Sequence, residues 1–377
     1  MVQKAAAPAA AAAAADYAAE YIRRTQARKL KRSQEYTASR FAFGTSLAIA
    51  LIALLLSFDL AEGTVNMISL AVAAIFLVES LFELAVSLLV KRAVIQDREL
   101  PRALRWSGLF SAVMVLNGNI FASISGFTRL QRERTIEYTL SIYMLLTTVC
   151  IVLVSSLNLF KAYVADTFLL GMYILAGLIV FDLLAMLLIS RWVTRSATSR
   201  KMLPLALCLI LSAATGNVFA LLIGIITISK LRHKDKDINI EWIDILSRLF
   251  RNNMSIIGMF LVVFLISLSL CSFLTFDYSI AVQNNYGAML LAPSLEYPFG
   301  TDNFGRCVFT RIVFGARISL VVGMLATATP LIVGGLLGAV AGYYSGRIEN
   351  IIMRALDVLY AVPSILLAIA IVAAFGA

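Results

Sequence analysis

Residues 166–190 read DTFLLGMYILAGLIVFDLLAMLLIS, and the apolar part of this run contains one acid, Asp182. A transmembrane helix needs about 20 mainly apolar residues. In hydrocarbon the backbone must satisfy its own hydrogen bonds, and a long apolar run does so as a helix. The stretch therefore predicts a membrane-spanning helix.

The rest of the chain has the same character. Of its 377 residues, 60% are hydrophobic and 14% are charged, which is far more apolar than a soluble domain. Strand-type alternation is absent, so we expect an all-α polytopic membrane protein. Further runs suited to a span lie at about 41–58, 66–90, 107–128, 138–160, 202–229, 254–276, 318–342 and 354–376.

The charge distribution predicts an orientation. The net charge is +10, which in a membrane protein reflects loops that keep Lys and Arg in the cytoplasm. Residues 1–40 are an alanine-rich stretch followed by a basic block, which we interpret as a cytoplasmic tail and not as a cleaved leader. The block orients the N-terminus towards the cytoplasm, and it could also bind anionic lipid headgroups.

The sequence gives little support for a metal site or for nucleic-acid binding. The four cysteines are scattered, and the single histidine, His233, lies in a solvated charge cluster. Neither pattern has the spacing of a metal site or of a disulfide framework. No folded basic domain is long enough to bind nucleic acid, so we expect no metal, no cofactor and no nucleic-acid partner.

Residues 41–230 contain an internal repeat. The segment NGNIFASISGFTRL (117–130) resembles TGNVFALLIGIITI (215–228), so that Gly118-Asn119 matches Gly216-Asn217. Other matches keep an offset near 100 residues. We interpret this as a duplicated membrane-helix unit with copies at about 36–130 and 138–228.

Two topologies fit the repeat. Three crossings per copy would invert the second copy and place the basic stretch 191–201 outside, against the positive-inside rule. If 107–128 and 202–229 instead bend at Gly-Asn into hairpins that face the cytoplasm, all the basic loops lie inside. Charge favours the hairpins, whereas length favours full crossings, and both alternatives leave residue 230 inside.

Three acids lie within predicted spans. Glu79 and Glu83 are one helical turn apart, and the repeat places Glu83 opposite Asp182. Intramembrane acids suggest an ion path or a bound ligand. The favoured alternative is that they face the repeat interface and hydrogen-bond to Asn, Ser or Tyr, and the sequence predicts no basic residue mid-span to pair with them.

A linker separates this repeat from the last third of the chain. The first half of 231–253 is charged, and its second half has apolar residues at helical spacing. That pattern predicts an amphipathic helix in the cytoplasmic interface. The next domain is expected at 254–377.

Residues 296–320, EYPFGTDNFGRCVFTRIVFGARISL, are polar and rich in glycine. Gly300 and Gly305 permit tight turns. Asp302 is placed to cap a short helix carrying Arg306 and Arg311. Arginines about five residues apart could form paired hydrogen bonds to carboxylates or to lipid headgroups. We therefore expect an external collar that orients the following span.

This segment resembles the C-type permease subunits of oligopeptide and dipeptide ABC importers, a family that includes nickel transporters. The resemblance covers about 244–377, and the N-terminal part is not recognised. Cys307 stands where the family has Asp, and Thr310 where it has Ser. The matching residues are Gly300, Thr301, Asp302, Gly305, Arg306, Arg311, Gly315, Arg317, Ser319 and Leu320, then Ala341, Gly342, Tyr343, Tyr344 and Gly346, and Asp357, Pro363, Leu366, Leu367, Ala368, Ile369 and Ala370.

The resemblance implies a type I ABC importer permease in the bacterial cell membrane, which moves solute by alternating access powered by separate ATPase subunits. It implies a second permease subunit, two ATP-binding subunits and an extracytoplasmic substrate-binding protein, which the collar would contact unless it serves only for anchoring. The chain itself has no phosphate-binding loop, so we expect no enzyme activity. In the family an ATPase-docking loop and further spans come after this point, so we expect a partial permease domain, either a fragment or a degenerate one.

Two prolines lie in apolar runs of the last third. Pro330 and Pro363 can bend their helices, which suits a gate, although simple packing kinks explain them equally well. Two other functions remain open: a membrane scaffold or sensor with a vestigial permease segment, and an ion-coupled transporter that uses the three acids.

Overall fold

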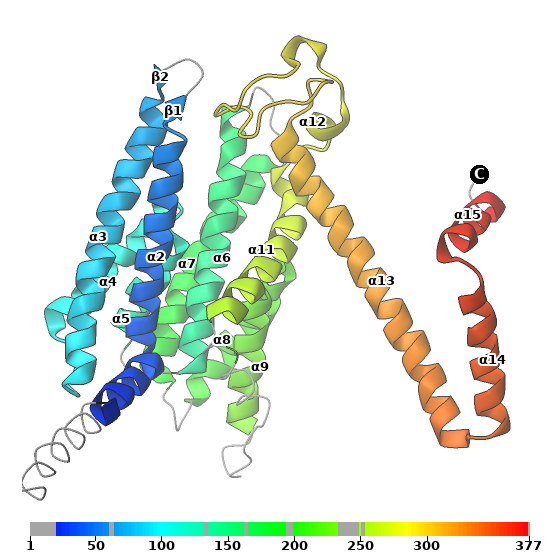
Figure 1. Cartoon of the computed structure of the whole chain (residues 1–377), viewed down its shortest axis with the longest axis horizontal. Coiled ribbons are helices and arrows are strands. Elements are labelled where there is room, and N and C mark those ends of the chain that lie inside the picture. The colour runs from blue at the N-terminus through cyan, green and yellow to red at the C-terminus, as the bar shows by residue number, and fades with distance from the viewer. Residues whose placement is uncertain are drawn as a thin grey trace, which may run out of the picture. The chain divides into compact units, whose positions relative to one another are not determined.

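The computed structural model describes residues 20–59, 64–131, 135–161, 165–193, 199–232, 249 and 253–375 (Figure 1). Helices form nearly all the regular structure of these residues, beside a short antiparallel pair, β1 (Phe58–Asp59) and β2 (Thr64–Val65). The chain divides into two compact units, Met1–Val313 and Phe314–Ala377.

Six helices of the described residues are long and apolar enough to cross a membrane, or up to seven if one bent helix pair counts as a span. Their outward faces are apolar, as in Leu55 and Tyr173, each 75% exposed. The chain is therefore a helical polytopic membrane protein, as the sequence predicts. The six are Gln34–Leu55, Met67–Ile95, Ile136–Phe160, Phe168–Trp192, Ser255–Thr275 and Val308–Tyr344.

The first repeat copy, called copy 1 (34–130), contains four helices. Two long helices, α2 (Gln34–Leu55) and α3 (Met67–Ile95), pack along each other, and two short ones follow, α4 (Arg102–Val113) and α5 (Ile120–Leu130). Helix α5 packs against both α4 and α2. Helix α2 begins seven residues before the expected span, and residues 20–32 are also helical, so the tail predicted at 1–40 is partly ordered helix.

The second copy, called copy 2 (136–232), repeats this order. The long helices α6 (Ile136–Ser156) and α7 (Phe168–Trp192) pack together and are followed by the short helices α8 (Leu203–Ser212) and α9 (Val218–Arg232). Helix α9 packs against α8 and α6. The first helix is capped in the same way in both copies, because Ser33 accepts from the N–H of Tyr36 and Thr135 from that of Tyr138.

The Gly-Asn segments are helical hairpins and not single crossings. Gly118 (φ 80°) and Gly216 (φ 85°) take the left-handed conformation that glycine adopts without strain, and each follows a short 3-10 turn. In copy 1 the two helices run antiparallel and touch, since a Cβ on Gly108 would lie 2.5 Å from the carbonyl oxygen of Gly126. The hairpin alternative therefore holds for the chain path, while the side of the membrane it faces stays a prediction.

Helix α11 (Asn253–Thr275) packs against α6 and α7, so the compact unit continues beyond the domain boundary expected near residue 254. The largest buried apolar cluster joins copy 2 to α11 through Phe219, Tyr143 and Phe260. The amphipathic helix predicted within 231–253 lies mostly outside the described residues.

The remaining helices are α12 (Ser279–Val282), α13 (Val308–Tyr344), α14 (Arg347–Ala361) and α15 (Ser364–Phe375). Helix α13 starts ten residues before the expected span at 318 and runs continuously through Pro330. The span expected at 354–376 is not one straight helix, because the chain breaks before Pro363, where a bend is predicted, and α14 and α15 meet at 88°. Proline lacks the N–H that would continue the helix ladder.

Candidate functional site

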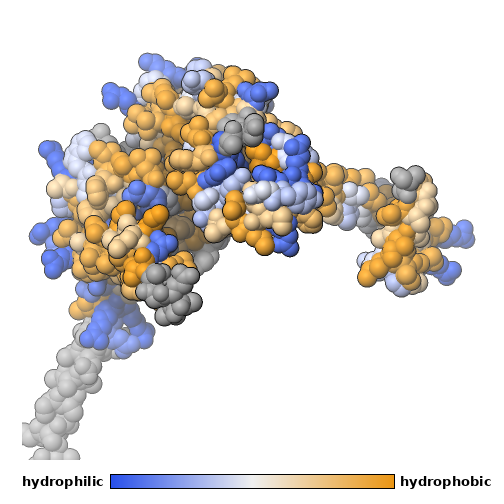
Figure 2. Space-filling view, turned by 90° about the horizontal axis from the view of Figure 1, so that it is seen from above, coloured by the Kyte–Doolittle hydropathy of each residue, from blue (hydrophilic) through white to orange (hydrophobic). Residues whose placement is uncertain are grey.

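The motif segment lies between α11 and α13, at the end of the unit that also carries the β-hairpin (Figure 1). Figure 2 looks onto this end and shows hydrophilic side chains gathered over the segment, with hydrophobic ones around them. Gly300 (φ 70°) and Gly305 (φ 72°) make the tight turns that the sequence predicts. A Cβ on Gly305 would lie 1.7 Å from the carbonyl oxygen of Asn285, so no side chain fits there.

Asp302 organises the turn between these glycines. Its Oδ1 accepts from the backbone N–H groups of Phe304 and Arg306, both at 2.9 Å. Its Oδ2 accepts from Arg306 Nε at 2.9 Å and from Arg311. The predicted helix cap is wrong, because α13 begins only at Val308 and Asp302 caps a turn instead.

Electrostatics keep the Asp302 carboxylate ionised. Partial burial favours the neutral acid, but the two backbone hydrogen bonds and the Arg306 guanidinium outweigh it and lower the pKa of Asp302 to about 2. Arg306 also lies over the ring of Phe304, 4.5 Å from its centre. Two of the predicted arginines are therefore engaged by an acid of their own motif.

Other motif residues hold the segment together. Thr301 Oγ1 donates to the carbonyl oxygen of Ala288 and accepts from the N–H of Leu291. Thr301 also forms a single β-bridge with Cys307. The structure thus brings the motif from Gly300 to Arg311 into one cluster, whereas Gly315 and Arg317 belong to the C-terminal unit.

Sequence reasoning missed Lys161, which lies just after α6. Its side chain is buried, donates to Thr310 Oγ1, and lies 5.8 Å from the ring centres of Phe276 and Phe309. Burial lowers the pKa of Lys161, although neighbouring Cys307 counteracts this. No local signal marks it, since its partner is 149 residues away in the chain.

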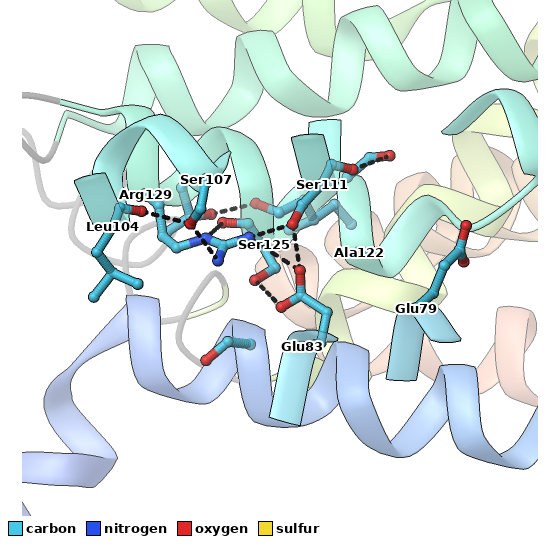
Figure 3. Close-up of polar contacts among 12 residues, drawn as sticks. Glu79, Glu83, Leu104, Ser107, Ser111, Ala122, Ser125 and Arg129 are labelled. Carbon is cyan, nitrogen blue, oxygen red and sulfur yellow. Dashed lines mark hydrogen bonds and ion pairs between the residues drawn. The ribbon is translucent and has the colours of Figure 1, made fainter. Parts of the chain in front are cut away.

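Glu83 forms a buried ion pair in copy 1. Figure 3 shows its carboxylate reaching from α3 to the α4–α5 hairpin, where it meets Arg129 at 3.0 Å, Ser125 at 3.0 Å and Ser111. Both side chains of the ion pair are 0% exposed. The expectation that no basic residue pairs with the intramembrane acids is wrong, because Arg129, which lies just outside the expected span 107–128, is buried on α5.

Among the described residues, the other two acids have neutral partners only. Glu79 accepts from Asn117 at 2.9 Å and from Asn119 at 2.7 Å. Asp182 accepts from Thr148 Oγ1 at 2.7 Å, and Asn217 lies 3.3 Å from the same hydroxyl. These are the Asn and hydroxyl neighbours that the interface interpretation expects. A role in moving ions stays untested.

No cluster of three or more His, Cys, Asp or Glu that could hold a metal occurs among the described residues. The free cysteines there, Cys150, Cys208, Cys271 and Cys307, form no disulfide.

Comparison with known proteins finds similarity to transport permeases. Residues 241–293 match the family described as the N-terminal TM domain of oligopeptide transport permease C. The dipeptide transport system permease protein of Alkalihalophilus pseudofirmus is 44% identical over 135 residues, which is 36% of this chain and 44% of that protein.

Other relatives agree. The dipeptide transport system permease protein of Bacillus subtilis is 39% identical over 129 residues, covering 34% of this chain and 40% of the relative. The glutathione transport system permease protein of Pectobacterium atrosepticum is 36% identical over 143 residues, covering 38% and 48%. The chain thus spans less than half the length of these relatives. No solved structure matches it.

Proposed function

We propose that this chain acts as a membrane permease subunit of a peptide-type ABC importer. The observation that carries the proposal is the similarity to transport permeases. Residues 241–293 match the N-terminal TM domain of oligopeptide transport permease C, and the chain is similar over 135 and 143 residues to permease proteins of dipeptide and glutathione transport systems. The motif residues Thr301, Asp302, Arg306 and Arg311, which follow residues 241–293 in the chain, form one hydrogen-bonded cluster.

In this proposal the chain contributes membrane helices and no covalent chemistry. Solute moves by alternating access, and ATP is hydrolysed by separate subunits that bind elsewhere in the assembly. A second permease subunit and an extracytoplasmic substrate-binding protein complete the system, with the bacterial cell membrane as its location. The Asp302 cluster would face the binding protein, because a loop held by internal ion pairs presents a preformed surface.

The test uses cells from which the gene carrying this chain has been deleted. We expect ATP-dependent uptake of a labelled dipeptide to be lost and to return when the gene is restored. Asp302→Ala should lower the restored uptake at least about tenfold, because it frees two arginines and removes two backbone hydrogen bonds. Asn303→Ala, at an exposed neighbouring position, should leave uptake unchanged.

The alternative of a scaffold or sensor predicts a different outcome. The matched region starts at residue 241, whereas copies 1 and 2 lie before it. If uptake of dipeptides and other small solutes is the same with and without the gene, and no ATPase subunit co-purifies with the chain, the permease proposal fails. The repeat would then be the working part of the protein.

A further inference from the structure

A cavity of about 460 Å³ opens beside the motif segment. Its lining combines Lys161 with Gly305 and Cys307 of the motif, and α12 and the residues after it contribute Ser279, Gln283 and Asn284. Asp277, Glu296 and Tyr297 also line it. Ligand pockets in proteins typically enclose about 300–1,000 Å³, so the space suits a small molecule.

The charge of Lys161 is buried without a carboxylate partner. The residue is 8% exposed, and its ammonium meets a hydroxyl, a thiol and two aromatic rings. Among the described residues no acid lies within ion-pair distance of it. A buried cation without an anion is costly, so an anion that enters the cavity would be attracted to this nitrogen.

The same cavity holds two carboxylates that have no cation of their own. Asp277 and Glu296 are half-buried, and no Lys or Arg of the described residues pairs with either. Asp277 accepts one backbone hydrogen bond, from the N–H of Ser279 at 2.8 Å. The lining therefore presents a positive group and two negative groups, together with amide side chains, and its best complement carries both signs of charge.

We propose that this cavity binds a small zwitterion, whose carboxylate is received by Lys161 and whose amine faces Asp277 and Glu296. Lys161 belongs to the segment between α6 and α7, outside residues 241–293, which match the permease family model. The duplicated domain thus supplies the cation of a site whose other residues come from the motif segment. The inference goes beyond the transport function and does not depend on it.

The experiment measures binding by calorimetry to the purified full chain in lipid nanodiscs. The probes are glycine, glycylglycine and triglycine, which differ in the separation of their two charges. We expect at least one of them to bind saturably. Its N-acetylated form and its C-terminally amidated form should each bind at least about tenfold more weakly than the parent. If none of the three binds, or if both blocked forms bind as well as the parent, the proposal is wrong.

Two variants locate the site. Lys161→Gln keeps a donor for Thr310 but removes the charge, and Asn284→Trp fills the cavity from an exposed position. Each should weaken binding at least about tenfold, whereas Lys91→Gln, at an exposed lysine of α3, should not. Thermal unfolding checks that the variants fold. Unchanged binding in folded Asn284→Trp would overturn the proposal even if Lys161→Gln fails to fold.

Discussion

Copies 1 and 2 share a chain path but stabilise their buried acids differently. In both, an asparagine after the hairpin glycine bonds a hydroxyl on the first long helix, Asn119 to Ser46 and Asn217 to Thr148. In copy 1 the acid of the second long helix is neutralised by Arg129. At the matching position, copy 2 has Thr227, whose hydroxyl is buried without a hydrogen-bond partner.

Copy 2 has an ion pair elsewhere, between buried Glu137 at the start of α6 and Lys230 at the end of α9, whose side chain is 24% exposed. The two copies thus share the backbone path and the Asn–hydroxyl bond, and they differ in the placement of charge. A buried ion pair fixes the position of its two helices more strictly than neutral hydrogen bonds do, because separation leaves bare charges in an apolar medium. Copy 1 should therefore respond more strongly than copy 2 to changes in its polar residues.

The largest expected effect comes from Arg129→Met. This change leaves Glu83 buried without its cation, and we expect a loss of about 3–5 kcal/mol of stability. The measurement is unfolding of the purified protein in mixed micelles by increasing denaturing detergent. Arg191→Met, at an exposed arginine of α7 in copy 2, is the matched control and should change little.

A double variant shows whether charge is the cause. Glu83→Gln together with Arg129→Met removes both charges, so it should be more stable than Arg129→Met alone. If the double variant is as unstable as the single one, the ion pair does not distinguish the two copies and packing of the arginine stem explains the loss.

A second effect tests how closely the hairpin helices approach. A Cβ on Gly126 would lie 2.4 Å from the carbonyl oxygen of Gly108 and 2.5 Å from the N of Ala112, both backbone atoms. On Gly224 the closest atom, at 2.6 Å, belongs to the side chain of Ile210. We expect Gly126→Ala to cost about 1–3 kcal/mol by overpacking, and Gly224→Ala to cost less.

Gly177→Ala provides the control for this pair. Nothing lies within 4 Å of a Cβ at Gly177, so alanine should stabilise α7 by about 0.5–1 kcal/mol. Equal losses for Gly126→Ala and Gly224→Ala in the same unfolding assay would show that the two hairpins are packed alike.

A third and smaller effect concerns the shared asparagine. The Asn119 amide donates to Ser46 and Glu79, and its carbonyl oxygen caps the N–H of Ala122. Asn217 donates to Met144 O and Thr148, but its Oδ1 has no hydrogen-bond partner. Asn119→Ala should lose about 1–2 kcal/mol and Asn217→Ala less, and the reverse order would contradict the comparison.

Sequence reasoning predicts the long helices and the Gly-Asn turns well, because both depend on local residues. Apolar runs fix the spans, and Gly118 and Gly216 mark the bends. It fails for contacts between distant segments. Arg129 follows an apolar run and looks like a loop residue, and only the packing of α5 against α4 and α2, beside Glu83 of α3, shows that it is buried. Lys161 contacts Thr310, which is 149 residues away in the chain, so no local stretch of sequence can predict this contact.

The break between α14 and α15 teaches the opposite lesson. Its signal, Pro363, is present in the sequence, and the residue before a proline avoids the helical conformation. The apolar composition of 354–376 nevertheless suggests one continuous span. Composition alone therefore overestimates the length of a helix wherever a backbone constraint interrupts it.

The smallest effect on stability is expected for Asp182→Asn. Asparagine keeps an oxygen that can accept from Thr148, and no cation of the described residues loses a partner, so stability should change by about 0.5 kcal/mol or less. Glu83→Gln removes the anion that pairs with Arg129 and should cost more in the same assay. Dipeptide uptake is the second measurement made on Asp182→Asn and Glu83→Gln. If Asp182→Asn is stable but abolishes uptake, the acid without a cation has a role in transport that its neutral hydrogen bonds do not explain. If stability and uptake are both retained, the acid of copy 2 belongs to the helix interface, and an ion path through it is excluded.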